Sequence, residues 1–194
     1  MDLTIAVTGM PGSGKSIVAQ TIARVLKAPI YSMGDVVRRE VVKRGLELTV
    51  SNVERVATLL RQELGKAAVA ILLFEEIKNI EGPVVIDGLR SLDEARILAK
   101  RGNLCIVAVH ASPYTRYRRL MARRRKDDIK SWEDLVLRDT KNLEFGIGAA
   151  IAMADYMIVN EGTLDEAEKA AINVAERIRD DKGKSCSGGG GPSH

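Results

Sequence analysis

Residues 9–16 read Gly-Met-Pro-Gly-Ser-Gly-Lys-Ser and match the pattern G-x-x-x-x-G-K-[ST]. The apolar run Leu3–Val7 stands directly before this segment. The stretch Lys15–Lys27, whose apolar residues recur at helical spacing, begins within it. A strand, a glycine-rich turn and a helix are therefore expected in immediate succession. This succession favours an α/β fold and places the turn at the carboxyl end of a strand.

The residue types of this turn suit the binding of phosphate groups. Its glycines allow a path that turns successive backbone N–H groups inward, and the start of the following helix adds a favourable dipole for anions. Lys15 would contact the β and γ phosphates of ATP, and the Ser16 hydroxyl would hold Mg²⁺. An ordinary glycine-rich turn beside a surface lysine is the alternative. The expected ATP-binding residues are Gly9, Met10, Pro11, Gly12, Ser13, Gly14, Lys15 and Ser16.

The composition fits one compact domain. The chain has 194 residues, of which 45% are hydrophobic, and this is enough for a sizeable core. No apolar run of about 18 residues occurs, and Asp2 leads straight into the first strand. We therefore expect no membrane span, no signal peptide and a cytoplasmic location. Cys105 lies in an apolar run and is expected to be a buried thiol, whereas Cys186 lies in a Gly/Ser-rich tail.

Apolar runs alternate with helical patterns along the chain, as in an α/β protein. We expect a three-layer P-loop domain over residues 1–182, with a five-stranded parallel sheet and helices on both faces, and a disordered tail over 183–194. The [ST]-x-x-[DE] spacing predicts helix N-caps at Ser51, Ser91 and Ser131. The predicted strands are Leu3–Thr8, Pro29–Tyr31, Val84–Asp87, Leu104–His110 and Tyr156–Asn160. The predicted helices are Lys15–Lys27, Gly34–Arg44, Asn52–Asn79 with a break near Gly65, Ser91–Arg101, Pro113–Arg124, Ser131–Glu144 and Leu164–Arg179.

Four further segments bear on the second substrate, because the loop alone is shared by kinases, GTPases and motor ATPases. The first segment, Tyr31–Arg38, places Asp35 at a helix entry and Arg38 one turn later. It resembles the Thr-Gly-Asp-x-x-Arg segment of nucleoside monophosphate kinases, in which the arginine binds the phosphate of the acceptor. That resemblance makes Asp35 and Arg38 candidate acceptor-binding residues. A plain helix cap and a solvated arginine are the alternative.

The second segment, Val84–Arg90, contains an apolar strand that ends in an aspartate. Asp87 at the carboxyl edge of the sheet is suited to bind Mg²⁺ through water, as the aspartate of the second Walker motif does. The stretch also resembles the Asp-Gly-x-Pro-Arg segment of adenylate kinases, although the proline is missing and Arg90 is shifted by one position. The resemblance implies that Arg90 binds the acceptor. An aspartate that only caps a turn is the alternative for Asp87.

The third segment, 116–128, is strongly basic and is followed by Arg138 one helix later. Phosphoryl transfer spreads negative charge over three oxygens, which arginines in a closing lid stabilise. Similar lids in nucleoside monophosphate kinases imply that Arg125 and Arg138 are catalytic, with Arg119 or Arg123 as further candidates. A solvated helix face is the alternative. Most of the excess of basic over acidic residues lies in this segment rather than along a broad face. Because only 4% of the residues are aromatic, nucleic-acid binding is not favoured.

The fourth segment, 151–162, resembles the end of dephospho-coenzyme A kinases in its Ala-Asp-x-x-Ile-x-Asn-x-Gly character. In related kinases the loop after the last strand lies against the adenine. This makes Asn160 and Gly162 candidate contacts to the base of ATP. A simple strand and turn is equally compatible with these residues.

Taken in order through residues 1–180, these segments resemble an archaeal family of adenylate-kinase-like or dephospho-coenzyme-A-kinase-like P-loop proteins. The resemblance implies a kinase that uses ATP and Mg²⁺, an acceptor-binding helical insert over residues 34–80 and a lid over 123–138. The expected acceptor is a small-molecule nucleotide, a nucleoside monophosphate, which needs no general base. One alternative is a dephospho-coenzyme A kinase, for which Asp35 or Asp87 would take a proton. The other is a non-catalytic sensor that binds ATP or AMP.

Overall fold

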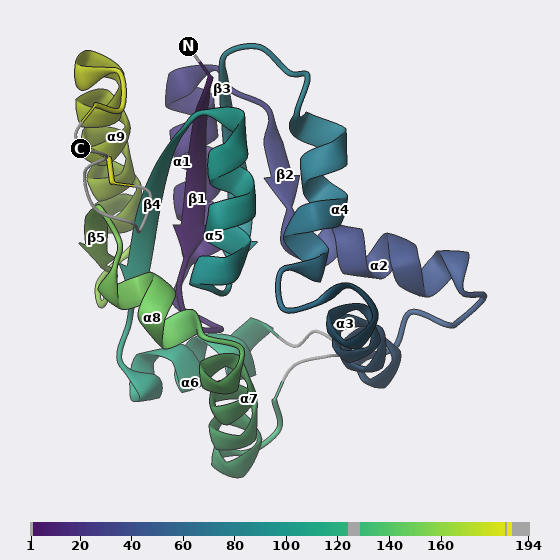
Figure 1. Ribbon diagram of the computed structural model, residues 1–194. Coiled ribbons are helices and arrows are strands. Elements are labelled where there is room, and N and C mark those ends of the chain that lie inside the picture. Colours follow the sequence, from purple (N-terminus) through teal and green to yellow (C-terminus); the bar gives the residue numbers. More distant parts are fainter. Residues whose placement is uncertain (1, 124–128, 185, 188–194) are drawn as a thin grey trace.

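The structure, a computed structural model, describes residues 2–123, 129–184 and 186–187. Five parallel strands form one sheet in the order β2-β3-β1-β4-β5 (Figure 1). The predicted parallel sheet of an α/β protein is confirmed. The strands are β1 (Leu3–Thr8), β2 (Ile30–Ser32), β3 (Pro83–Leu89), β4 (Asn103–His110) and β5 (Tyr156–Val159).

Helices cover both faces of the sheet, so the chain forms three layers. Side chains alternate across a strand, and successive residues of β1 therefore enter two different cores. Ile5 and Val7 pack under α1 and α9, whereas Ala6 packs under α4, α5 and α8. Burial on both sides explains why the strands read as continuous apolar runs. The helices are α1 (Lys15–Leu26), α4 (Ala68–Ile77), α5 (Leu92–Leu98), α8 (Ile147–Ala152) and α9 (Leu164–Asp181).

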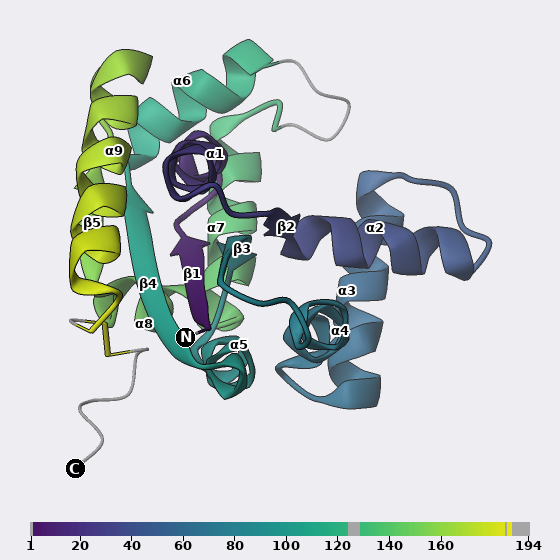
Figure 2. The same ribbon diagram turned by 90° about the horizontal axis from the view of Figure 1, so that it is seen from above.

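Two further pairs of helices flank the carboxyl ends of the strands (Figures 1 and 2). The pair α2 and α3 extends from the β2 edge. The pair α6 and α7 stands beyond the ends of β1 and β4 and has a small core formed by Leu120, Ile129 and Leu135. In parallel sheets the crevice at the carboxyl edge is the usual ligand site. These helices are α2 (Met33–Lys43), α3 (Val50–Leu64), α6 (Pro113–Arg123) and α7 (Trp132–Glu144).

Most helix starts agree with the capping signals in the sequence. Ser91 and Ser131 cap α5 and α7 as predicted. The cap predicted at Ser51 is wrong, because the hydroxyl of Thr49 accepts a hydrogen bond from the Asn52 N–H at 3.2 Å. The helix α3 therefore begins at residue 50, and Ser51 lies inside it. Thr49 and Ser51 are both suitable capping residues, and the local sequence does not show which of them precedes the helix.

Of two other helical features, the break at Gly65 was predicted and the helix α8 was not. The long helix predicted over 52–79 is divided at Gly65, as expected. The helix α8 was not predicted, because six residues are too few to reveal a helical period. Within the ranges that the structure describes, no helix combines the length and the apolar character of a membrane span.

Cys105 and Cys186 form a disulfide, so the expectation of a free buried thiol at residue 105 is wrong. The start of the predicted tail is also ordered. The Gly183 N–H donates to the Ile178 carbonyl at 2.9 Å, and the Ser187 N–H donates to Asp155 at 2.6 Å. The prediction of disorder is therefore too early by a few residues. For residues 188–194, which lie outside the described residues, it stays a prediction. The pairing could not be recognised from the sequence, because the two cysteines are 81 residues apart. They meet only after α9 has packed in the same core as β4.

Replacing Cys186 with serine is expected to lower the free energy of unfolding of the oxidised protein by about 2–4 kcal/mol, since a cross-link across a long loop restricts the unfolded chain. Thermal unfolding of both proteins, with and without reductant, measures the difference. Reductant should destabilise the wild type and leave the variant unchanged. Two free thiols in wild-type protein denatured without reductant would contradict the pairing.

Candidate active site

The loop between β1 and α1 follows a path that only glycine tolerates at two positions. Gly12 has a φ of +83° and Gly14 a φ of +93°, both in the left-handed region. A Cβ on Gly12 would come within 2.9 Å of the Arg116 carbonyl oxygen, and one on Gly14 within 2.3 Å of the Asn160 Nδ2. The glycines are thus needed for close packing of the loop against α6 and against Asn160, which follows β5, in addition to the phosphate cradle that the sequence suggests.

The N-terminus of α1 is suited to an anion. Its N-cap is Gly14, which offers no side chain to the first N–H groups, and its first turn carries no acidic residue. By contrast, α7 and α9 begin with complete capping boxes. The first N–H groups of a helix have no partner within the helix, and its dipole favours negative charge there. The predicted loop therefore presents the features of a phosphate-binding site.

Lys15 stands at the centre of a cluster of charged side chains. The pKa of Lys15 is lowered to about 8, chiefly because the side chain is buried; the negative charge of Asp87 opposes this change, and the charges of Arg90, Arg138 and Arg123 add to it. These neighbours come from the end of β3, from α6 and from α7, which are far apart in the sequence. Because cations outnumber the one carboxylate, an anion placed among them would be strongly stabilised.

Asp87 lies near the end of β3, beside Ser32 of β2 and Val7 of β1 in the sheet register. Its buried Oδ1 has no hydrogen-bond partner among the described residues. A buried carboxylate oxygen normally has one, and water or a metal ion supplies it where the protein does not. Ser16 is exposed in the first turn of α1. These two oxygen donors fit Mg²⁺, which prefers few protein oxygens together with water and phosphate.

Arg90 follows directly on β3, as its position in the sequence suggests. Its backbone N–H donates to the Glu94 Oε2 at 2.8 Å. Burial lowers the pKa of Arg90, and its guanidinium makes no hydrogen bond to other residues that the structure describes. Five N–H donors are thus left for a ligand.

Glu94 and Arg61 complete this side of the site, and neither was among the predicted site residues. The Glu94 side chain is 1% exposed and accepts a hydrogen bond from the Arg61 Nη2 at 3.3 Å. Burial raises the pKa of Glu94, and Arg61 opposes the change. The Arg61 guanidinium also lies over the Phe145 ring, 4.3 Å from its centre. Glu94 was visible only as the third residue after a cap, a position that is usually solvated.

Asp35 and Arg38 lie on α2, where the sequence placed them. They pair with each other, with the Arg38 Nε donating to Asp35 at 3.0 Å, and both side chains are about half exposed. No contact joins them to Arg90 among the described residues. Their role in binding the acceptor stays a prediction, and it requires the pair to open.

Asn160 is buried, and its side chain is hydrogen-bonded within the protein. It is 6% exposed, its Nδ2 donates to the Ser13 carbonyl at 2.8 Å, and its Oδ1 accepts from Arg119 at 3.3 Å. Arg119 also donates to the carbonyls of Asn160 and Gly162, at 2.9 and 3.1 Å. The Asn160 side chain thus joins the phosphate loop, through Nδ2, to Arg119 of α6, through Oδ1. Contact with the base of ATP, which the sequence suggested, stays a prediction.

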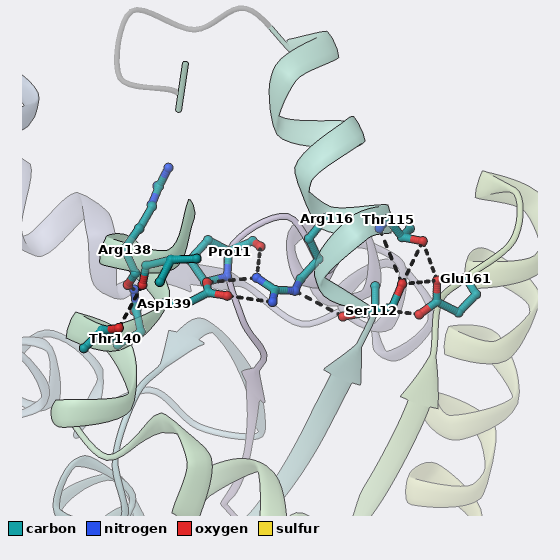
Figure 3. A network of polar contacts seen from close by, with 11 residues as sticks. Pro11, Ser112, Thr115, Arg116, Arg138, Asp139, Thr140 and Glu161 are labelled. Carbon is teal, nitrogen blue, oxygen red and sulfur yellow. Dashed lines mark hydrogen bonds and ion pairs between the residues drawn. The ribbon is translucent and has the colours of Figure 1, made fainter. Parts of the chain in front are cut away.

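A second network ties the loop to α6 and α7. The Arg116 side chain is buried and donates hydrogen bonds to the Pro11 carbonyl, to the Ala111 carbonyl and to both carboxylate oxygens of Asp139 (Figure 3). Nothing in the local sequence distinguishes Arg116 from the other arginines nearby. Arg125 lies outside the described residues. Arg138 lies on α7 next to Asp139.

Comparison with known proteins identifies the family. Residues 8–136 match the model of an AAA domain. A UPF0200 protein of Aeropyrum pernix is 51% identical over 89% of this chain and 92% of its own length. A UPF0200 protein of Thermococcus onnurineus is 50% identical over 91% of this chain and 98% of its own. The chain belongs to the UPF0200 family.

The fold of this UPF0200 protein is that of P-loop kinases. A gluconokinase from Sinorhizobium meliloti is similar with a TM-score of 0.60 and 20% identity, over 92% of this chain and 94% of that one. A shikimate kinase from Bacteroides thetaiotaomicron is similar with a TM-score of 0.61 and 19% identity, over 91% and 98%. The predicted P-loop kinase architecture is thereby confirmed.

Proposed function

We propose that this UPF0200 protein is an ATP- and Mg²⁺-dependent kinase that transfers the γ-phosphoryl group to a nucleoside monophosphate. The observation that carries the proposal is the cationic cluster of Lys15, Arg90 and Arg138 around Asp87, at the carboxyl edge of the sheet. Lys15 belongs to the phosphate loop, which would hold ATP. Arg90 lies near Arg61 of α3, within the expected acceptor-binding insert over residues 34–80. A site in which several cations lie near one carboxylate suits two phosphorylated substrates.

In the proposed reaction, an oxygen of the acceptor phosphate forms a bond to the γ-phosphorus of ATP. The bond from that phosphorus to the β,γ-bridging oxygen breaks, and ADP leaves with the electron pair. The acceptor phosphate is ionised at neutral pH, so no proton has to be removed. Lys15 and Arg138 would stabilise the charge on the transferring group. Mg²⁺, held by Ser16 and through water by Asp87, would neutralise charge between the β and γ phosphates.

The acceptor would bind at Arg90. The guanidinium is planar and pairs with two oxygens of a phosphate at once. Glu94 fixes the backbone at Arg90 and is itself held by Arg61, so the anchor of the acceptor site is rigid. Arg38 would add a second guanidinium once its exposed ion pair with Asp35 opens. Such exposed pairs contribute little stability, so opening costs little.

A hydroxyl acceptor, as in dephospho-coenzyme A, is the second candidate. A hydroxyl must lose a proton during transfer, and the unpartnered Oδ1 of Asp87 is suited to receive it. The names of the shikimate kinase and the gluconokinase of similar fold add shikimate and gluconate to the hydroxyl compounds to be tested.

The test is an acceptor screen with radiolabelled ATP and Mg²⁺ over nucleoside monophosphates, dephospho-coenzyme A, shikimate and gluconate. We expect labelled nucleoside diphosphate, with a KM for the acceptor at least about 10-fold higher in Arg90→Ala, since the charge-assisted hydrogen bonds of one guanidinium are lost. Arg96→Ala, an exposed arginine of the same segment, is the matched control. ATP binding without any labelled product would contradict the proposal and support a sensor.

A further inference from the structure

We propose that Arg116 and Asp139 are a positioning pair, which holds α7 against the phosphate loop and so fixes Arg138 at the transferring phosphate. The proposal rests on the proposed function, in which Arg138 contacts the γ-phosphate. It differs from the expectation of a lid over 123–138, because it makes Arg138 part of a rigid donor site.

One guanidinium joins three separate elements. The Arg116 Nε donates to the Ala111 carbonyl at 3.1 Å, within the turn that enters α6. Nη1 donates to the Pro11 carbonyl in the phosphate loop at 3.2 Å. Nη1 and Nη2 also donate to the two oxygens of Asp139 on α7, at 2.9 and 2.7 Å. Four of the five N–H donors are therefore used within the protein, and they fix the loop, α6 and α7 in one geometry.

The burial of this pair shows that it is not a surface ion pair. The side chains of Arg116 and Asp139 are 4% and 17% exposed. An exposed pair is screened and mobile, whereas a bidentate pair in this environment keeps both its distance and its plane. Lysine carries three donors on one compact ammonium group and has no planar fork, so it cannot reproduce the two parallel hydrogen bonds to Asp139. The site thus requires arginine rather than any cation.

The positions of Arg138 and Asp139 connect the pair to the reaction. Figure 3 shows Asp139 directed at Arg116, and Arg138 extending from the neighbouring position of α7 in another direction. The Asn142 Nδ2 donates to the Arg138 carbonyl at 2.7 Å, and this contact lies within α7. The charge of Arg138 acts on both Lys15 and Arg90. Holding Asp139 therefore sets where Arg138 stands relative to the loop.

The base of α6 is anchored as well. Glu161, just after β5, accepts hydrogen bonds from the Ser112 N–H and from the hydroxyls of Ser112 and Thr115, the last at 2.6 Å (Figure 3). This carboxylate joins the start of α6 to the sheet. The contacts run without a gap from β5 through α6 and Arg116 to α7. Preorganised cations of this kind stabilise developing charge without a cost of reorganisation at the moment of reaction.

The test measures how well the site recognises the γ-phosphate, as the ratio of the dissociation constants for ADP and ATP in saturating Mg²⁺. Calorimetry gives the ratio for the wild type, Asp139→Asn, Arg116→Lys, Arg138→Ala and the double variant Asp139→Asn/Arg138→Ala. We expect a roughly 10-fold fall in the ratio for Arg138→Ala and a similar fall for the two variants of the pair. The double variant should fall no further than Arg138→Ala, since both changes remove the same contact.

Arg118→Ala, an exposed arginine of the same helix, is the matched control and should leave the ratio unchanged. A melting temperature for each variant separates positioning from loss of fold. An unchanged ratio in both variants of the pair, or an additive loss in the double variant, would overturn the proposal. Equal binding of ADP and ATP by the wild type would also overturn it. A wild type that favours ATP but yields no product in the acceptor screen would refute the proposed function alone, because the ratio does not depend on turnover.

Discussion

At pH 7, replacing Lys15 with methionine is expected to abolish phosphoryl transfer and, at the same time, to raise the melting temperature of the free protein. The two effects have one cause. Lys15 is partly buried near Arg90, Arg138 and Arg123, where its positive charge is unfavourable until phosphate binds. Methionine has a similar length and no charge, so it removes the repulsion and the catalytic contact together.

The pH dependence of stability gives the sign and the size of this effect. The pKa of Lys15 is about 8 in the folded protein and 10.5 in the unfolded chain, so between these values the unfolded chain binds more protons. The stability contributed by Lys15 therefore rises as the pH increases from 8 to 10.5. Below pH 8 the charge on Lys15 lowers the free energy of unfolding of the ligand-free protein by about 1–3 kcal/mol. The methionine variant should be more stable by that amount and lack this dependence.

Three measurements check the prediction. Differential scanning calorimetry should show a melting temperature higher by roughly 3–10 °C at pH 7, with the difference vanishing above pH 10. ATP should raise the melting temperature of the wild type and not that of the variant. The transfer rate should fall by at least about 10³-fold. Lys100→Met, at an exposed lysine, is the control. An active variant, or one less stable than the wild type at pH 7, would contradict the scheme.

The parts of this fold that could be predicted are those governed by neighbouring residues. A buried parallel strand is a continuous apolar run, so β1 and β4 were found within a residue of their bounds. A glycine in the left-handed region ends a helix by itself, so the break at Gly65 was also predicted. The helix α8 was missed because its six residues are too few to show a helical period.

The same distinction applies to the candidate site. The phosphate loop is local, and its sequence is sufficient to recognise it. Arg116, Glu94 and Asp139 acquire their roles only when the fold places them against partners between 23 and 105 residues away. Nothing in a run of charged residues says which one will be buried. The basic segment therefore suggested arginines in general, and the structure was needed to separate Arg116 from its exposed neighbour Arg118.

Asp87→Asn is expected to lower the transfer rate by about 10- to 100-fold and to move the alkaline limit of activity to lower pH. The first effect follows if the buried carboxylate orients water on Mg²⁺, because outer-shell partners of a metal typically contribute this much. The second follows from electrostatics. Asp87 raises the pKa of Lys15, so removing its charge lowers that pKa below about 8.

The pH profile separates these two effects. The ratio kcat/KM for ATP reports the ionisation of the free enzyme, and it should fall in the wild type as the pH rises through about 8, when Lys15 loses its proton. In Asp87→Asn the same fall should occur at lower pH, and saturation should require more Mg²⁺. Asp93→Asn, at an exposed carboxylate that pairs with Arg96, is the control. A loss of rate with no shift of the profile would mean that Asp87 serves the metal but does not act on Lys15. A shift of the pH profile with an unchanged Mg²⁺ requirement would mean that Asp87 acts on Lys15 but takes no part in holding the metal.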